Sequence, residues 1–107
     1  MKRGDLVTVA MQGAYGKPRP ALVIQSDLFD EHPSVTILPL TSEIHDAPVF
    51  RLDLMPNAET GLRVPSQIMI DKISTVPRDK LGQPFGHLDK TEMQSVDRAL
   101  AVFLGFA

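Results

Sequence analysis

The chain has 107 residues, of which 43% are hydrophobic, so it can bury one modest core, and we expect a single domain over residues 1–107. With 11 basic and 13 acidic residues the net charge is −2, which excludes a generally basic surface for nucleic acid and leaves only a local basic site. Cysteine is absent and the longest apolar run, residues 99–104, is far too short for a membrane span, which excludes disulfides, thiolate chemistry and membrane insertion.

The first half of the chain predicts short β-strands joined by turns. Aliphatic and β-branched residues cluster, or alternate with polar ones, over residues 6–10, 21–25, 35–40 and 49–54. Between the first two strands, residues 12–18 contain two glycines and a proline, which indicates a loop. Residues 26–30 are typical of a turn or one short helical turn.

The second half predicts two more strands and one helix. The strands are expected over residues 62–70 and 72–76, with a break near Asp71, and the turns over residues 55–61 and 77–82. Asp89 and Glu92 form a capping-box pattern, and Gly105 stands where a helix ends.

A helix is therefore expected from about Lys90 to Leu104. Met93, Val96, Leu100 and Phe103 or Leu104 recur at helical spacing, so this apolar stripe should pack on the strands. The predicted fold is mainly β with a C-terminal helix, an α+β arrangement in which six short strands form a small antiparallel barrel.

One arginine stands in an unusually rigid setting. Pro18 and Pro20 flank Arg19, and Pro20 drives Arg19 into an extended conformation at the start of an apolar strand. Lys17 precedes this segment and makes it the obvious local basic site. An ordinary loop-to-strand junction with a surface arginine gives the same pattern, so the motif needs support from the rest of the chain.

Arg19, Thr41 with Ser42, and Asp71 form a candidate constellation. If the second and third strands are antiparallel neighbours, Arg19 and Thr41 share one rim of the sheet. A guanidinium beside hydroxyls is a natural site for a phosphate and suits phosphoryl transfer. Taken singly, Thr41 is more typical of a turn former and Asp71 of a solvated turn residue, so only the combination points to chemistry.

Other kinds of site find no support. The chain lacks a glycine-rich phosphate loop, a nucleophile elbow and a histidine pair at metal spacing. His32, His45 and His87 are isolated and are expected to be surface histidines, so we predict neither metal nor cofactor. No apolar run of signal-peptide length follows the basic start of the chain, and we expect a cytoplasmic protein.

Several short segments, in order, resemble the toxin family of type II toxin-antitoxin modules that includes MazF, PemK and Kid. The resemblance runs nearly end to end and is carried by Lys2-Arg3-Gly4-Asp5, Arg19-Pro20-Ala21-Leu22-Val23-Ile24, Leu38-Pro39-Leu40-Thr41-Ser42, Pro65-Ser66-Gln67 and Asp71-Lys72-Ile73, followed by the C-terminal helix. It implies an SH3-like barrel, a homodimer, and a sequence-selective endoribonuclease that cleaves single-stranded RNA without a metal and is neutralised by a cognate antitoxin.

The resemblance also assigns roles. Arg19 and Thr41 correspond to the residues most often tied to cleavage, Arg19 stabilising phosphoryl charge and Thr41 orienting the phosphate. Asp71 is a weaker catalytic candidate, because Met69 stands where the Kid and PemK branch has an arginine, and this leaves the general base open. Lys17, Ser42 and Gln67 are expected RNA contacts because they flank this site. The antitoxin is expected to cover Arg19 and the loop over residues 12–17.

Two alternative functions are compatible with the same fold but involve no RNA cleavage. Gyrase poisons of the same fold act on a protein through a tryptophan near the C-terminus, and this chain contains no tryptophan. A noncatalytic barrel that binds RNA or peptide would favour an aromatic platform. Only 6% of the residues are aromatic, and Phe85, Phe103 and Phe106 are expected in or near the helix region.

Overall fold

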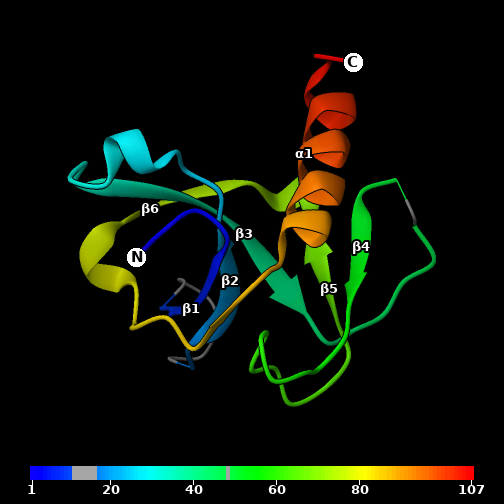
Figure 1. Ribbon diagram of the computed structural model, residues 1–107, viewed down its shortest axis with the longest axis horizontal. Helices are drawn as coiled ribbons and strands as arrows, with labels where there is room; N and C mark the ends of the chain where they lie inside the picture. The colour runs from blue at the N-terminus through cyan, green and yellow to red at the C-terminus, as the bar shows by residue number, and fades with distance from the viewer. Residues whose placement is uncertain (11–16, 48) are drawn as a thin grey trace.

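The computed structural model describes residues 1–10, 17–47 and 49–107, and within them a curled antiparallel sheet packs against one helix (Figure 1). The strands are β1 (Asp5–Val9), β2 (Arg19–Val23), β3 (Ser34–Thr41), β4 (Arg51–Leu54), β5 (Ser66–Met69), β6 (Ser74–Pro77) and β7 (Gly86–His87), and the helix is α1 (Lys90–Leu104). Short 3₁₀ turns occur at η1 (Asp27–Phe29), η2 (Ile70–Lys72) and η3 (Arg78–Lys80).

The long strand β3 organises the sheet. The strand order is β4-β5-β3-β2-β1-β7, and β6 also pairs with β3. Along the edge of β3 that faces away from β2, its first half pairs with β6 and its last two residues pair with β5. The chain makes the η2 turn between β5 and β6, so the predicted break near Asp71 is confirmed. This sharing of one long strand bends the sheet toward a half-open barrel.

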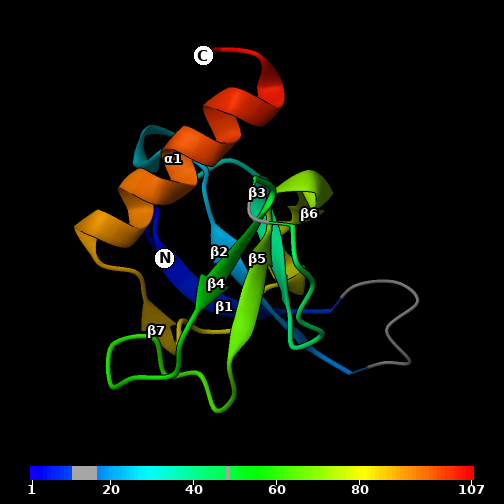
Figure 2. The ribbon, with the colours of Figure 1, turned by 90° about the vertical axis from the view of Figure 1, so that its right-hand side faces the viewer.

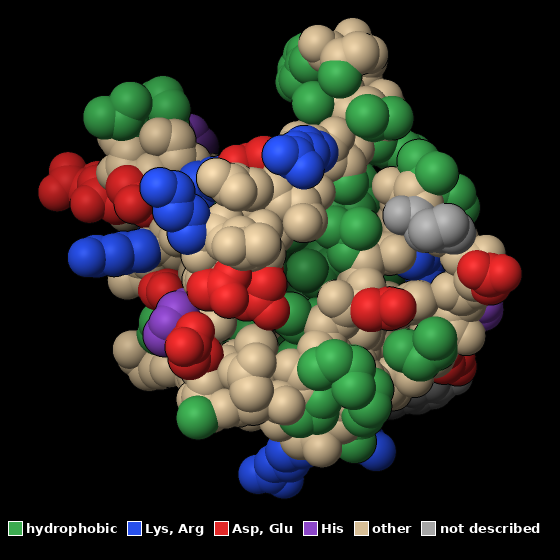
Figure 3. All heavy atoms as spheres, turned by 45° about the vertical axis from the view of Figure 1, so that its right-hand side comes forward, with side chains coloured by type: hydrophobic (Ala, Val, Ile, Leu, Met, Phe, Trp, Pro, Cys, Tyr) green, Lys and Arg blue, Asp and Glu red, His purple; other side chains and the backbone are tan. Residues whose placement is uncertain are grey.

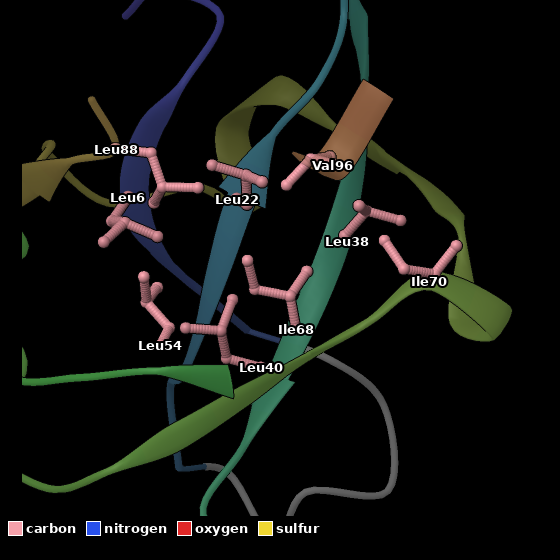
Figure 4. Packing of buried hydrophobic residues seen from close by; sticks show 9 residues of the cluster. All are labelled: Leu6, Leu22, Leu38, Leu40, Leu54, Ile68, Ile70, Leu88 and Val96. Atoms are coloured by element: carbon pink, nitrogen blue, oxygen red, sulfur yellow. The ribbon is translucent and has the colours of Figure 1, made fainter. Parts of the chain in front are cut away.

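Two hydrophobic clusters occupy the two faces of the sheet. The larger one joins β1, β2 and β3 to β4, β5 and α1, and Figure 4 shows its side chains converging from these elements: Leu6, Leu22, Leu38, Leu40, Leu54, Ile68, Ile70, Leu88 and Val96. The smaller cluster lies on the other face of β1, β2 and β3: Val7, Val9, Ala21, Val23, Val35 and Ile37. The central strands therefore carry apolar side chains on both of their faces.

The helix begins and ends where the sequence predicts. The Asp89 carboxylate accepts a hydrogen bond from the Glu92 N–H at 2.7 Å, and Glu92 Oε1 accepts one from the Asp89 N–H at 2.8 Å. Gly105 ends the helix in the left-handed conformation with φ +88°, which a residue without Cβ adopts at little cost.

The expected apolar stripe of the helix is only partly buried. Val96 is fully buried, but Phe103 and Leu104 are 46% and 49% exposed, so the prediction that they pack on the strands is wrong. Figure 2 shows the reason, because the last turns of α1 project beyond the edge of the sheet. Hydrophobic side chains therefore gather at the free end of the helix (Figure 3), where Val102 and Phe106 are also exposed.

Most differences in the strands lie at their ends. Strand β7 was not predicted, because two residues, Gly86 and His87, carry no periodicity, and they pair with Leu6 and Asp5. The expected strand over residues 62–70 is shorter and spans only Ser66–Met69. Pro65 directly precedes it, and proline lacks the N–H that a ladder needs.

Candidate active site

A row of side chains crosses the sheet at one level. The cross-strand partners are Val9 with Arg19, Thr41 with Gln67, and Gln67 with Asp53. The β2–β3 register pairs Ala21 with Pro39, and its extension by two residues brings Arg19 level with Thr41. Because cross-strand partners point to the same face, Arg19, Thr41, Gln67 and Asp53 follow one another along that face. The expectation that Arg19 and Thr41 share one rim of the sheet agrees with this register.

This rim opens on a cleft. The cleft has a volume of about 1240 Å³, and Arg19, Thr41, Ser42 and Asp71 all contribute to its lining. Arg19 is exposed and forms no ion pair with an acidic residue in the described ranges. The guanidinium is thus available to a ligand.

The charge in the cleft is locally positive although the chain is acidic overall. The lining includes the cations Arg19, Arg63 and Lys72 and the anions Glu43 and Asp71. Of these anions, Asp71 is already paired with Arg51, which does not line the cleft itself. The balance therefore favours an anionic ligand such as a phosphodiester.

The Thr41 hydroxyl oxygen is held by a backbone N–H group. Its Oγ1 accepts a hydrogen bond from the Glu43 backbone N–H at 3.1 Å, which fixes the start of the following loop. A hydroxyl has one proton to donate, and within the described residues Thr41 donates it to none. The proton can therefore be offered to a phosphate oxygen in the cleft.

Asp71 lies in the η2 turn, as the sequence indicates, but it is paired and largely buried, so the interpretation of it as solvated is wrong. Arg51 Nε donates to Asp71 Oδ1 at 3.0 Å and Arg51 Nη2 donates to Oδ2 at 3.4 Å. The Arg51 and Asp71 side chains are 13% and 21% exposed. The arginine reaches Asp71 from β4, where Arg51 is the cross-strand partner of Met69. The carboxylate is thereby held at the edge of the cleft.

The three expected RNA contacts differ in their placement. Ser42 is exposed and lines the cleft, and Lys17 is exposed just before Pro18, which also lines it. Gln67 is only 2% exposed, and its amide bonds to the His45 backbone and to the Asp53 carboxylate. Its geometry therefore favours a role inside the fold over a direct contact with RNA. The remainder of the loop before Lys17, residues 11–16, lies outside the described residues.

Other candidate groups stay at the surface. Nδ1 of His32 accepts a hydrogen bond from the Ser34 N–H at 3.0 Å within its own turn, and His87 Nε2 lies 3.9 Å from an exposed carboxylate of Glu59. Within residues 1–10, 17–47 and 49–107 no group of three metal-ligating side chains comes together. Nor does any helix in those ranges have the length and hydrophobicity to cross a bilayer.

Sequence reasoning missed several residues around the cleft. Arg51 and Asp53 lie in a strand recognised only by its alternation, and nothing local shows which partners they face across the sheet. Phe85 was expected near the helix, but it lines the cleft at 38% exposed, beside Gly61. Gly61 has φ +64°, and a Cβ there would lie 2.5 Å from the Phe85 carbonyl oxygen, so the close approach requires glycine.

Comparison with known families agrees with this arrangement. A family model described as the PemK-like, MazF-like toxin of type II toxin-antitoxin systems matches residues 2–104. This chain belongs to the PemK/MazF-like toxin family. A relative from Mycolicibacterium smegmatis, named a probable endoribonuclease MazF, is 52% identical over all of this chain and 99% of its own length. Endoribonuclease EndoA of Bacillus subtilis is 28% identical over 97% of this chain and 94% of its own length.

Solved structures of PemK/MazF-like toxins share the fold. The Mycobacterium tuberculosis toxin MazF-mt6 superposes with a TM-score of 0.81 at 22% identity, covering 94% of this chain and 96% of that one. A mycobacterial endoribonuclease solved in complex with its cognate antitoxin gives a TM-score of 0.81 at 23% identity, covering 100% of this chain and 97% of that one. The expected small barrel with a C-terminal helix is thus confirmed.

Proposed function

We propose that this chain is the toxin of a type II toxin-antitoxin module and acts as a metal-independent, sequence-selective endoribonuclease on single-stranded RNA. One arrangement carries the proposal: Arg19, which forms no ion pair within the described residues, and the Thr41 hydroxyl are brought level by the strand register at the rim of a locally positive cleft. Membership in the PemK/MazF-like family and the 52% identical relative named an endoribonuclease support the reaction class.

The reaction is an in-line displacement at phosphorus. The ribose 2′-oxygen forms a bond to the adjacent phosphorus, and the bond from phosphorus to the 5′-oxygen of the next nucleotide breaks. The products are a 2′,3′-cyclic phosphate and a 5′-hydroxyl. The 2′-hydroxyl proton passes to a base, and the leaving 5′-oxygen takes a proton from water. The protein has to position the RNA and stabilise charge on the phosphoryl oxygens.

The roles follow from what each group can donate or accept. Arg19 donates to the phosphoryl oxygens that gain charge and assists the departing 5′-oxygen, because a guanidinium can bind two oxygens at once. Thr41 donates its hydroxyl proton to a phosphoryl oxygen. Asp71 is the catalytic carboxylate we assign to the cleft, where it accepts the 2′-hydroxyl proton while Arg51 fixes its position.

RNA is bound along the rim as well as at the reacting phosphate. Lys17 contacts phosphate and Ser42 contacts phosphate or a base edge, since both side chains are exposed next to the cleft. A cognate antitoxin segment neutralises the enzyme by covering Arg19 and the loop before it. The protein works in the cytoplasm as a homodimer of single-domain chains, and the exposed hydrophobic end of α1 is consistent with cover by a second copy.

The decisive experiment is cleavage of a long mixed-sequence RNA in excess EDTA, with fragment ends mapped. We expect cuts at a recurring short motif, cyclic phosphate ends, and a loss on the order of a hundredfold or more in Arg19→Ala. Arg98→Ala, an exposed arginine on α1, is the matched control and should cleave normally. In the same assay Asp71→Asn should lose at least about a hundredfold, because a general base would be missing.

Three outcomes would count against the proposal. Near-native cleavage by Arg19→Ala would show that the reaction does not need Arg19. Cleavage that EDTA abolishes and a divalent metal restores would contradict a metal-independent mechanism. Intact RNA with a folded protein would favour a toxin that acts on a protein target such as gyrase, or a noncatalytic binding module. The absence of tryptophan weighs against the gyrase mode.

A further inference from the structure

Gln67 is the buried polar side chain closest in register to the proposed catalytic hydroxyl. It lies on β5 directly opposite Thr41 on β3. Its Oε1 accepts a hydrogen bond from the His45 N–H at 3.0 Å, and its Nε2 donates to the His45 carbonyl at 2.8 Å and to Asp53 Oδ1 at 2.9 Å. Both amide protons and one lone pair are therefore in use, as burial of a primary amide requires.

The amide of Gln67 forms the hydrogen bonds to the loop backbone that a neighbouring β-strand would otherwise form. It pairs with the N–H and the carbonyl of the same residue, His45, in the loop that follows β3. The neighbouring loop residues 42–46 are exposed, so side-chain packing contributes little to their order. The loop is instead held by hydrogen bonds to its backbone: at His45 from Gln67, at Glu43 to the Thr41 hydroxyl, and at Ala47, whose carbonyl accepts from the N–H groups of residues 50 and 51.

These bonds connect the buried amide to the site. The Glu43 N–H that orients the Thr41 hydroxyl is two residues from His45, so the position of that N–H depends on where Gln67 holds the loop. We propose that Gln67 is a positioning residue for RNA cleavage: it clamps the 42–47 loop, with Asp53 as its anchor, and so fixes the direction in which Thr41 donates its proton. This inference rests on the proposed function.

The clamp requires a hydrogen-bond donor at position 67, because two acceptors face it. In Gln67→Glu the shape is kept but the amide protons are lost, so the carboxylate faces two acceptors, the His45 carbonyl and Asp53. Asp53→Asn alone still accepts from Gln67 through its amide oxygen. In the double variant the new amide at position 53 can turn and donate to the carboxylate at position 67, which restores one bond of the clamp.

The experiment measures kcat and KM on a short RNA that contains the mapped motif, together with hydrogen exchange of the His45 and Glu43 amides. For Gln67→Glu we expect kcat to fall about 10- to 100-fold with KM changed less than about threefold, because the donor is misdirected while the RNA contacts remain. Exchange at His45 should accelerate. Asp53→Asn should remain within about threefold of wild type, and the double variant should recover at least about threefold of the lost kcat.

Gln25 provides a matched control in the same chain. Its amide also clamps a loop, accepting from the Thr36 N–H and donating to the carbonyls of Phe29 and Ser34, but it does not line the cleft. Gln25→Glu should therefore disturb the 26–33 loop to a similar degree and leave kcat unchanged. Should Gln67→Glu fail to fold, Asp53→Ala, at an exposed position, removes the anchor and should lower kcat by a smaller factor.

The outcomes separate the two proposals. The positioning role would be overturned if Gln67→Glu had the wild-type kcat, or if Gln25→Glu lowered kcat by as much as Gln67→Glu does. It would also be overturned if the double variant had no higher kcat than Gln67→Glu. If the folded wild-type protein leaves the RNA intact, the proposed function fails instead. The exchange rate of the His45 amide reports on the clamp in either case, because it does not depend on activity.

Discussion

Arg51 and Asp71 form an ion pair between β4 and the η2 turn, with Arg51 Nε 3.0 Å from Asp71 Oδ1. The guanidinium carbon also lies 6.0 Å from the centre of the Phe50 ring. This pair places a carboxylate at the cleft without adding a net negative charge, which matters for a site that has to attract a phosphodiester.

Replacing only one partner of this pair leaves a half-buried charge without compensation. We expect Arg51→Met to lower the free energy of unfolding by about 1–2 kcal/mol, between the values typical of exposed and buried pairs. The double variant with Asp71→Asn should regain most of this loss, because no lone charge remains. Urea unfolding of the four proteins in the cycle measures the coupling, and additive effects would contradict the pairing.

The Thr41 hydroxyl should be essential for the rate and its methyl group should not. Thr41→Val keeps the shape and removes the proton, so we expect cleavage to fall on the order of a hundredfold. Thr41→Ser keeps the hydroxyl and should stay within roughly fivefold of wild type. Single-turnover cleavage of the mapped RNA motif tests both, and equal rates for the two variants would exclude the proton donation.

Lys17 should affect binding through charge alone. Because one phosphate contact on a single strand contributes a salt slope of about 0.7, Lys17→Ala should reduce the slope of log K against log salt by about that amount. The measurement uses RNA binding in the Arg19→Ala background, where the RNA stays intact. Lys90→Ala, at an exposed position in the first turn of α1, is the matched control and should leave the slope unchanged.

The core beneath the helix should tolerate little loss of volume. Leu38 is fully buried beside Val96 and Ile70 (Figure 4), so Leu38→Ala should destabilise the protein by about 2–5 kcal/mol. Leu28, at 86% exposed, is the matched control, and Leu28→Ala should change stability by less than about 0.5 kcal/mol. Thermal unfolding followed by circular dichroism distinguishes the two, and a small effect at Leu38 would mean that the site collapses to fill the cavity.

The capping box should contribute measurably to the stability of α1. Asp89→Ala removes the acceptor for the Glu92 N–H and should lower the free energy of unfolding by about 1 kcal/mol, which corresponds to roughly 4–8 °C in Tm for a domain of this size. Glu92→Gln can still bond the Asp89 N–H and should remain close to wild type. A Tm that Asp89→Ala leaves unchanged would show that the first turn is held by packing alone.

The sequence predicts elements whose signals are local and misses those that depend on pairing. The start and end of α1 are correct because Asp89, Glu92 and Gly105 act within one turn of the helix. Strand β7 and the short β5 were mispredicted because two-residue pairing and a proline boundary leave almost no pattern. Helical spacing of apolar residues does not show whether the sheet reaches far enough to cover them. The exposed end of α1 is an example, because its apolar residues keep that spacing beyond the edge of the sheet.

For the site, the sequence by itself determined the extended arginine between two prolines, the strand-end hydroxyl, and the family to which they belong. Only the tertiary structure showed which side chains pair with one another around the site. Arg51 meets Asp71 across 20 residues of chain and Gln67 meets His45 across 22, and neither pair is marked by any motif. The physical reason is that cross-strand register is set by the packing of the whole sheet, so it determines which distant side chains share a face.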